Sequence, residues 1–185
     1  RYSRRGQAAL FWFKGDGSSY FIEDNSRIGT VIGSIDEFGS ISHINDHHFH
    51  YGYWLNVAAQ IALRDPESAR KDRGGGMVNL LVADIATSER GRADFPFLRN
   101  FDPYEGHSWA SGDAAFVDGN NQESSSEAVN AWAGLILWAE ATGNTALRDK
   151  AIWLYTTEIE AITDYWFDMR GKIFPAAYGK TVAAM

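Results

Sequence analysis

Two long stretches near the end of the chain carry the strongest structural signal in the sequence. Residues 125–142 and 145–167 place apolar side chains at steps of three and four, which is the period of an amphipathic α-helix. Gly143 and Asn144 lie between the two stretches, and these residue types favour the end of one helix and the start of the next. The pair therefore predicts an antiparallel helical hairpin.

Two further helices are expected earlier in the chain. Residues 49–63 show the same helical period and end before Asp65 and Pro66. A second helix is predicted to follow the glycine run 74–76 and to carry the apolar residues between Met77 and Ile85. We expect a mainly all-α fold, a single domain over 1–185, built of helical hairpins with a site at their loop end.

The remaining segments are expected to be a short β-hairpin and loops. Residues 8–13 and 18–22 are aromatic-rich and flank turn residues at 14–17, which favours two paired strands. Residues 29–39 and 89–121 hold too many Gly, Asp and Ser for a lasting period, so both are predicted to be loops. The longer of the two is the expected lining of a site.

Charge and hydropathy narrow the classes of partner. The chain has 24 acidic and 17 basic residues, a net charge of −7, which repels nucleic-acid phosphates. No run reaches the ~20 apolar residues of a membrane-spanning helix, and residues 1–7 lack the apolar stretch of a signal peptide. Cysteine is absent, which excludes disulfides and leaves the compartment open.

The first chemically rich cluster is residues 45–53, which hold one acid, three imidazoles and two phenols. A carboxyl group among aromatic rings is poorly solvated, so Asp46 could stay protonated and donate to a leaving oxygen. The alternative is that Asp46 caps the following helix by accepting backbone N–H bonds. A zinc site built from His43, His47, His48 and His50 is a second alternative.

The second cluster is residues 120–130, in which Glu123 and Glu127 stand four apart. Like charges at this spacing repel on a helix, whereas an inverting hydrolase needs a base that deprotonates water opposite the acid. The alternative is a capping box in which Glu127 bonds back to the backbone N–H of Ser124. That alternative explains Glu127 and leaves Glu123 as the stronger candidate base.

Between these clusters, residues 99–112 alternate aromatic rings with hydrogen-bonding groups. Ring faces stack on the C–H faces of sugars, and Asp, Asn, His and Arg satisfy hydroxyl groups. An ordered surface loop with aromatic anchors would have the same composition. The segment therefore indicates, without proving, a carbohydrate-binding cleft.

The strings 45–53, 99–112 and 118–128 resemble glycoside hydrolase family 81, and they occur here in that family's order. The resemblance implies an extracellular enzyme that cleaves internal bonds of β-1,3-glucan with inversion, inside an (α/α)6 toroid preceded by other domains. It implies no metal and no organic cofactor, and it leaves the oligomeric state open. A non-catalytic glucan-binding fragment and a zinc hydrolase are the competing hypotheses.

Carried over by position, the resemblance makes Asp46 the acid, Glu123 the base and Glu127 an assisting carboxylate. If the mechanism inverts, the acid and base should lie ~6.5–9.5 Å apart. Residues expected to line the sugar subsites are His50, Tyr51, Asp102, His107 and Trp109, with Asn45, His47, Tyr104 and Glu105 from the same strings.

Two features depart from the family pattern. The family tends to carry Trp-Gly-Thr before the first motif, whereas Arg27-Ile28-Gly29-Thr30 stands here. A full toroid has twelve helices, and periodicity predicts about four in this chain. Either the remaining helices lie outside this chain, or the chain is a reduced form of the toroid; we expect a part of the catalytic toroid.

Overall fold

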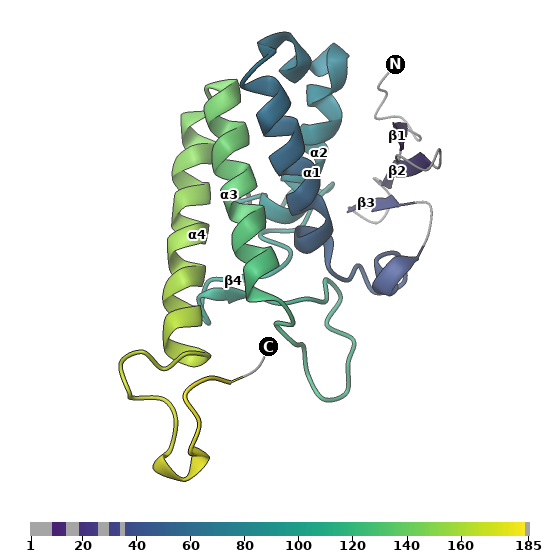
Figure 1. Ribbon diagram of the computed structural model, residues 1–185. Coiled ribbons are helices and arrows are strands. Elements are labelled where there is room, and N and C mark those ends of the chain that lie inside the picture. Colours follow the sequence, from purple (N-terminus) through teal and green to yellow (C-terminus); the bar gives the residue numbers. More distant parts are fainter. Residues whose placement is uncertain (1–8, 14–18, 26–29, 34–35, 184–185) are drawn as a thin grey trace.

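A computed structural model describes residues 9–13, 19–25, 30–33 and 36–183, and within them the fold is mainly helical. Helix α1 packs on α3, α3 packs on α4, and α1 also contacts α2. In Figure 1, α1, α3 and α4 run side by side, and α1 and α3 begin at the same end. The helix bounds are α1 His47–Ala62, α2 Gly76–Ala86, α3 Ser125–Thr142 and α4 Thr145–Tyr165.

These bounds confirm the four predicted helices to within two residues at either end. Ser124 accepts a bond from the Glu127 N–H at the start of α3, and Asn144 does the same for Leu147 at the start of α4. Gly143 has a φ of 66°, the left-handed conformation that ends a helix. Local capping chemistry therefore fixes this hairpin.

Helices α1 and α3 approach so closely that glycine is required on both. A Cβ atom at Gly52 would lie 2.7 Å from the Ala131 Cα, and one at Gly134 would lie 2.8 Å from the Asn56 Nδ2. Buried apolar side chains from α1 to α4 fill the space around this contact. The largest fully buried ones include Trp132, Trp138, Leu55, Leu81 and Leu154.

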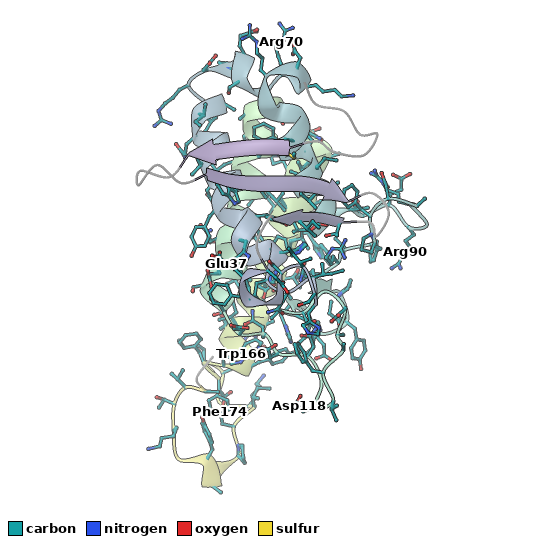
Figure 2. All side chains as sticks on the ribbon, turned by 90° about the vertical axis from the view of Figure 1, so that its right-hand side faces the viewer. Glu37, Arg70, Arg90, Asp118, Trp166 and Phe174 are labelled. Atoms are coloured by element: carbon teal, nitrogen blue, oxygen red, sulfur yellow. The ribbon has the colours of Figure 1, made fainter. Side chains whose placement is uncertain are left out.

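A three-stranded antiparallel sheet lies over α1 and α2 (Figure 2). Its order is β1 Ala9–Phe13, β2 Ser19–Asn25 and β3 Thr30–Gly33. The β1–β2 pairing confirms the predicted hairpin, although residues 14–18 of its turn lie outside the described residues. The prediction that 29–39 is entirely loop is wrong, because the β-branched residues 30–32 pair with β2.

Short elements complete the described chain. The long irregular stretch contains a small antiparallel hairpin of β4 Phe101–Asp102 and β5 His107–Ser108, which contacts α4. Residues 27–29, where the family pattern is altered, lie outside the described residues. The remaining turns of helix are η1 Glu37–Gly39, η2 Pro66–Ala69, η3 Lys71–Gly75 and η4 Ala176–Tyr178.

A buried carboxylate on α2 holds the sheet to the helices. Asp84 Oδ1 accepts bonds from the Thr30 hydroxyl at 2.8 Å, the Val31 N–H at 3.2 Å and the Arg99 Nη2 at 3.1 Å. Asp84 Oδ2 lies 2.6 Å from the His47 Nδ1. Burial would raise the pKa of Asp84, but His47, Arg99 and Thr30 outweigh it and lower the pKa.

Replacing Asp84 with Asn is expected to lower the free energy of unfolding by roughly 3–5 kcal/mol, because it removes one partner of a buried ion pair. Chemical denaturation monitored by circular dichroism measures the change. Asp72→Asn is the matched control, since Asp72 pairs with Arg70 at the surface and should change stability little. Equal stability of the two variants would contradict the structural role of Asp84.

Candidate active site

Asp46 immediately precedes α1 and is 4% exposed. Its backbone is left-handed, with a φ of 60°, and its side chain makes no capping bond. Among the described residues, its Oδ1 atom is buried without a hydrogen-bond partner. The alternative that Asp46 is a helix cap is therefore wrong for the side chain, and the carboxyl group is left available.

The surroundings of Asp46 favour its protonated form. Burial is the largest cause, and the charges of Glu123 and Glu127 add to it, so the pKa of Asp46 rises to about 7. His47 acts in the opposite direction and lowers the pKa. A carboxylic acid with this pKa holds a proton in a useful fraction of molecules near neutral pH.

Glu123 lies just before the N-cap residue of α3 and is exposed. Its φ of 63° is left-handed, a conformation that costs a side-chain-bearing residue about 1–3 kcal/mol and that clusters at functional sites. The Glu123 Oε2 accepts a bond from the Asn121 Nδ2 at 3.2 Å. An exposed carboxylate with one amide partner retains room to bind a water molecule.

Glu127 occupies the first turn of α3, and the expected capping box is only half formed. The Ser124 hydroxyl accepts from the Glu127 N–H at 3.4 Å, but the Ser124 N–H donates to the Gln122 carbonyl instead. The Glu127 Oε1 accepts from the Tyr53 hydroxyl at 2.9 Å, and this bond raises the pKa of Tyr53. Glu127 therefore faces α1 and not its own helix start.

The backbone of one residue, Ala110, joins the acid-bearing and base-bearing segments. The Ala110 carbonyl accepts from the Asp46 N–H at 2.9 Å, and the Ala110 N–H donates to the Asn121 carbonyl at 2.7 Å. Ala110 is fully buried against Phe49 and Ala128. The structure thus brings the two predicted clusters together around a single backbone position.

Two other predicted residues lie beside these carboxylates. His50 is partly buried, and its pKa is lowered, mainly by burial and then by the charge of His47. The charges of Glu127, Glu37 and Glu123 act in the opposite direction and offset part of this shift. Asn45 donates from its Nδ2 to the Phe38 carbonyl at 2.9 Å. Both residues keep partly exposed surface.

Sequence reasoning missed two aromatic residues at this site. Phe38 is 73% exposed, and its ring lies 5.8 Å from that of His50. Tyr53 is exposed and donates its hydroxyl to Glu127, although no separate role was predicted for it. An aromatic residue in a segment predicted to be loop carries no periodic signal, so Phe38 could be found only in three dimensions.

His47 and Tyr51 are interior residues, which corrects their expected contact with sugar. His47 is fully buried, with its Nε2 2.8 Å from the Ser40 carbonyl and its Nδ1 on Asp84. Tyr51 is buried and donates its hydroxyl to the Val31 carbonyl. Neither side chain is placed to touch a ligand, and both support the segment that carries Asp46.

The β4–β5 hairpin holds the other predicted sugar contacts. Asp102 accepts from the Tyr104 N–H at 2.8 Å and the Trp109 Nε1 at 3.2 Å, so it braces the turn. His107 is buried, 5.0 Å from the Trp166 ring, and does not meet the expectation of direct sugar contact. Tyr104 is 92% exposed, and Glu105 and Trp109 are partly exposed.

The zinc alternative lacks a ligand set in the part of the chain that the structure describes. No group of three or more His, Asp and Glu side chains there could hold a metal ion. His47 is engaged by Asp84, and His48 is buried with its Nε2 3.0 Å from the Ser108 hydroxyl.

Within the described ranges, no helix has the length and apolar character needed to cross a membrane.

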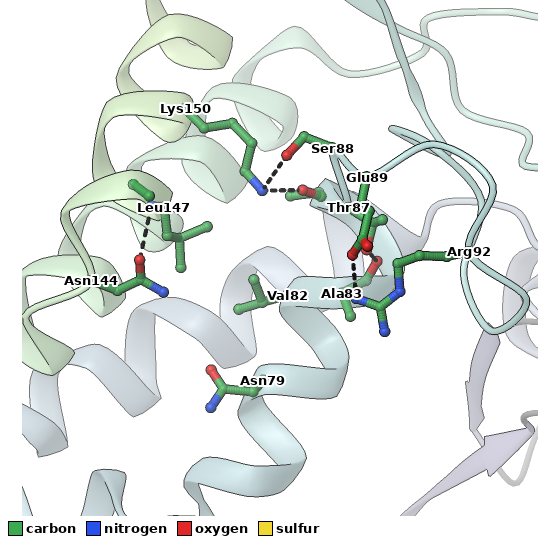
Figure 3. Close-up of a pocket in the computed structure, with 12 residues that line it drawn as sticks. Asn79, Val82, Ala83, Thr87, Ser88, Glu89, Arg92, Asn144, Leu147 and Lys150 are labelled. Atoms are coloured by element: carbon green, nitrogen blue, oxygen red, sulfur yellow. Dashed lines mark hydrogen bonds and ion pairs between the residues drawn. The ribbon is translucent and has the colours of Figure 1, made fainter.

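A separate pocket lies between α2 and the start of α4 (Figure 3). Asn79, Asn144 and Arg92 line it, together with Lys150, whose Nζ donates to the Ala86 carbonyl and lies 3.5 Å from the Ser88 hydroxyl. None of the candidate site residues lines this pocket. The carboxylate cluster is the candidate active site because Glu123 and Glu127 act on the pKa of Asp46 and Ala110 joins their segments.

Most of the chain is similar to proteins named as glucanases. The chain is 59% identical over 177 residues to a glucan endo-1,3-beta-D-glucosidase of Acetivibrio thermocellus, covering 94% of this chain and 23% of that protein. It is 42% identical over 171 residues to a glucan endo-1,3-beta-D-glucosidase of Thermobifida fusca, covering 92% of this chain and 22% of that protein. The chain thus spans about a quarter of the length of these relatives.

A solved structure and a family definition give the same result. A mutant of a family 81 glycoside hydrolase from Clostridium thermocellum superposes with a TM-score of 0.83 at 60% identity, over 88% of this chain and 23% of that one. That relative has a helical toroid fold, and the present helices match part of it. Residues 24–181 match the glycosyl hydrolase family 81 C-terminal domain. This chain therefore belongs to glycoside hydrolase family 81.

Proposed function

We propose that this chain supplies the catalytic carboxylates of an extracellular endo-β-1,3-glucanase, as part of a larger toroidal domain that includes residues 1–185. The observation that carries the proposal is the buried Asp46, whose pKa of about 7 is set by burial and by the two glutamates beside it. A proton donor and a carboxylate that can activate water are the groups that glycoside hydrolysis requires. The relatives' names supply the substrate class.

The proposed reaction is a single displacement with inversion. Asp46 transfers its proton to the glycosidic oxygen as the bond from that oxygen to the anomeric carbon breaks. Glu123 removes a proton from the water that attacks the anomeric carbon on the opposite face. The products are two shorter glucan chains, of which one carries a new reducing end in the α configuration.

The remaining residues have supporting roles in this proposal. Glu127, held by Tyr53, contributes negative charge that keeps Asp46 protonated and helps to orient the water. Sugar rings would contact His50, Asn45, Phe38, Tyr104, Glu105 and Trp109, all of which have exposed or partly exposed surface. No metal or organic cofactor has a step in this reaction.

Proton NMR of freshly formed products tests the stereochemistry. Laminarin is incubated with the protein, and the anomeric signals are recorded before mutarotation equilibrates them. We expect the α-anomer to appear first, because the attacking water approaches the face opposite the scissile β bond. An initial β-anomer would reject the inverting mechanism and the assignment of Glu123 as a base acting through water.

A glucan-binding fragment without activity is the second candidate function. Apolar side chains remain exposed on α1 and α4, including Tyr53, Val57, Ile61, Trp153 and Ile159, and the chain spans about a quarter of its relatives. Elements that hold the carboxylates in register could therefore be supplied by the rest of the protein. Binding of laminarin by this chain without release of reducing ends would favour this function.

A further inference from the structure

The deeply buried carboxylate of Glu158, on α4, has no part in the proposed reaction. Glu158 is fully buried, and α4 lies on the opposite side of α3 from α1 (Figure 1). Burying a carboxylate is costly unless several donors bind it. The hydrogen bonds of Glu158 therefore indicate which segments of the chain it holds in place.

Donors from three different segments converge on Glu158. The Ser108 N–H donates to its Oε2 at 2.9 Å, and the Ser108 hydroxyl donates to its Oε1 at 3.1 Å. The Gln122 Nε2 donates to Oε1 at 3.1 Å, and the Trp132 Nε1 donates to Oε2 at 3.1 Å. One side chain thus fixes β5, the loop before α3 and the middle of α3.

Two of these bonds lead to the candidate catalytic residues. Gln122 is adjacent to Glu123, so its amide fixes the base-bearing loop at the residue before the left-handed turn. Ser108 leads to the acid-bearing segment, because its hydroxyl also lies 3.0 Å from the His48 Nε2, two residues after Asp46.

The direction of the His48 bond follows from proton counting. The Ser108 hydroxyl has one proton, which it gives to Glu158, so it must accept from the Nε2–H of His48. Burial lowers the pKa of His48 well below its usual value, which keeps the ring neutral. In this tautomer the His48 Nδ1 carries no proton, and it has no partner among the described residues.

We infer that Glu158 is a positioning residue, which holds the Asp46 segment through Ser108 and His48 and the Glu123 segment through Gln122 at a fixed separation. The inference deepens the proposed function and rests on it for the roles of Asp46 and Glu123. The separation of two carboxyl groups decides whether a water molecule fits between base and sugar, so a loosened loop should reduce turnover more than binding.

Three variants of the full chain test the inference. Glu158→Gln replaces one carboxylate oxygen, which accepts hydrogen bonds, with an NH2 group, which donates them. The new N–H groups then face the donors that Glu158 binds. Gln122→Met removes the link to the Glu123 loop and also removes a buried oxygen that has no partner among the described residues. Trp132→Phe is the matched control, since it removes a different donor to the same carboxylate from the middle of α3.

The readout is the pKa of Asp46, measured by NMR titration of carbon-13-labelled aspartate carboxyl groups. The charged groups that act on Asp46 are Glu123, Glu127 and His47. If the Glu123 loop moves away and water enters, the pKa should fall by about 1 unit in Glu158→Gln and Gln122→Met. Trp132→Phe should lower the melting temperature and leave the pKa of Asp46 unchanged.

An unchanged Asp46 pKa in folded Gln122→Met would overturn the inference, and so would an equal fall in Trp132→Phe. Gln122→Met retains the charge of Glu158, so a fall in that variant cannot come from loss of that charge. A laminarin assay on the same samples reports separately on the proposed function. If the pKa falls in Gln122→Met while wild type binds laminarin without cleaving it, the positioning role stands and glucan binding without activity is favoured for this chain.

Discussion

Asp46→Asn is expected to lower kcat on laminarin by about 10²–10⁴-fold, the range that a positioned general acid contributes. An amide cannot give a proton to the leaving oxygen, although it has the size and shape of the acid. Binding of oligosaccharide should be retained, because the substitution leaves the partly exposed ring of His50 in place. Initial rates and isothermal titration with a laminari-oligosaccharide measure the two effects separately.

This substitution should leave the fold intact. Asn adopts the left-handed conformation as readily as Asp, and the Asp46 side chain has no hydrogen bond to lose within the described part of the chain. The pKa of Asp46 rises from 3.8 to about 7 on folding, so its contribution to stability is greatest below pH 3.8 and is lost as the pH rises towards 7. Asp46→Asn should therefore reduce the fall in stability between these pH values.

Asp118→Asn is the matched control. Asp118 is exposed in the loop that precedes Glu123, and the substitution makes the same change from a carboxyl group to an amide. It should retain wild-type turnover. Retained turnover in Asp46→Asn would remove Asp46 from the role of acid. Loss of turnover in both variants would indicate that any loss of negative charge near the carboxylate cluster lowers activity, and not that Asp46 is the acid.

The helical hairpins could be predicted because their signals are local. Apolar residues at helical spacing, the caps at Ser124 and Asn144 and the left-handed Gly143 all act within a few residues of one another. Strand β3 was missed because it has only four residues, too few to show a period, and because its anchor Asp84 lies more than fifty residues away. A contact at that distance along the chain leaves no local pattern in a single sequence.

The candidate site was predictable in its residue types and not in its geometry. The sequence points to Asp46 and Glu123, but it shows neither their left-handed backbones nor the bonds by which Ala110 joins the two segments. His47 has the composition of a ligand contact, yet its partners Asp84 and Ser40 make it an interior support. Side chains of adjacent residues point in different directions at the start of a helix. Some residues of a dense motif therefore face the site and others face the core.

Glu123→Gln is expected to lower kcat by about 10²–10⁴-fold, whereas Glu127→Gln should have a smaller effect. Glu123 is exposed and free to bind a water molecule through one oxygen, since its Oε2 accepts from Asn121. Glu127 is partly buried, and its Oε1 is engaged by Tyr53. A base must reach the attacking water, and Glu123 is the more exposed of the two glutamates.

The pH dependence separates the two glutamates from each other and from a loss of folding. The negative charges of both raise the pKa of Asp46, so neutralising Glu127 should lower that pKa and move the basic limb of kcat/KM to lower pH. Glu127→Gln retains enough activity for this limb to be measured, and the matched surface variant Glu140→Gln should leave it in place. An unmoved limb in Glu127→Gln would show that this charge does not act on the acid. A greater loss of kcat in Glu127→Gln than in Glu123→Gln would instead make Glu127 the base, because the group that deprotonates water cannot be replaced by a neutral amide.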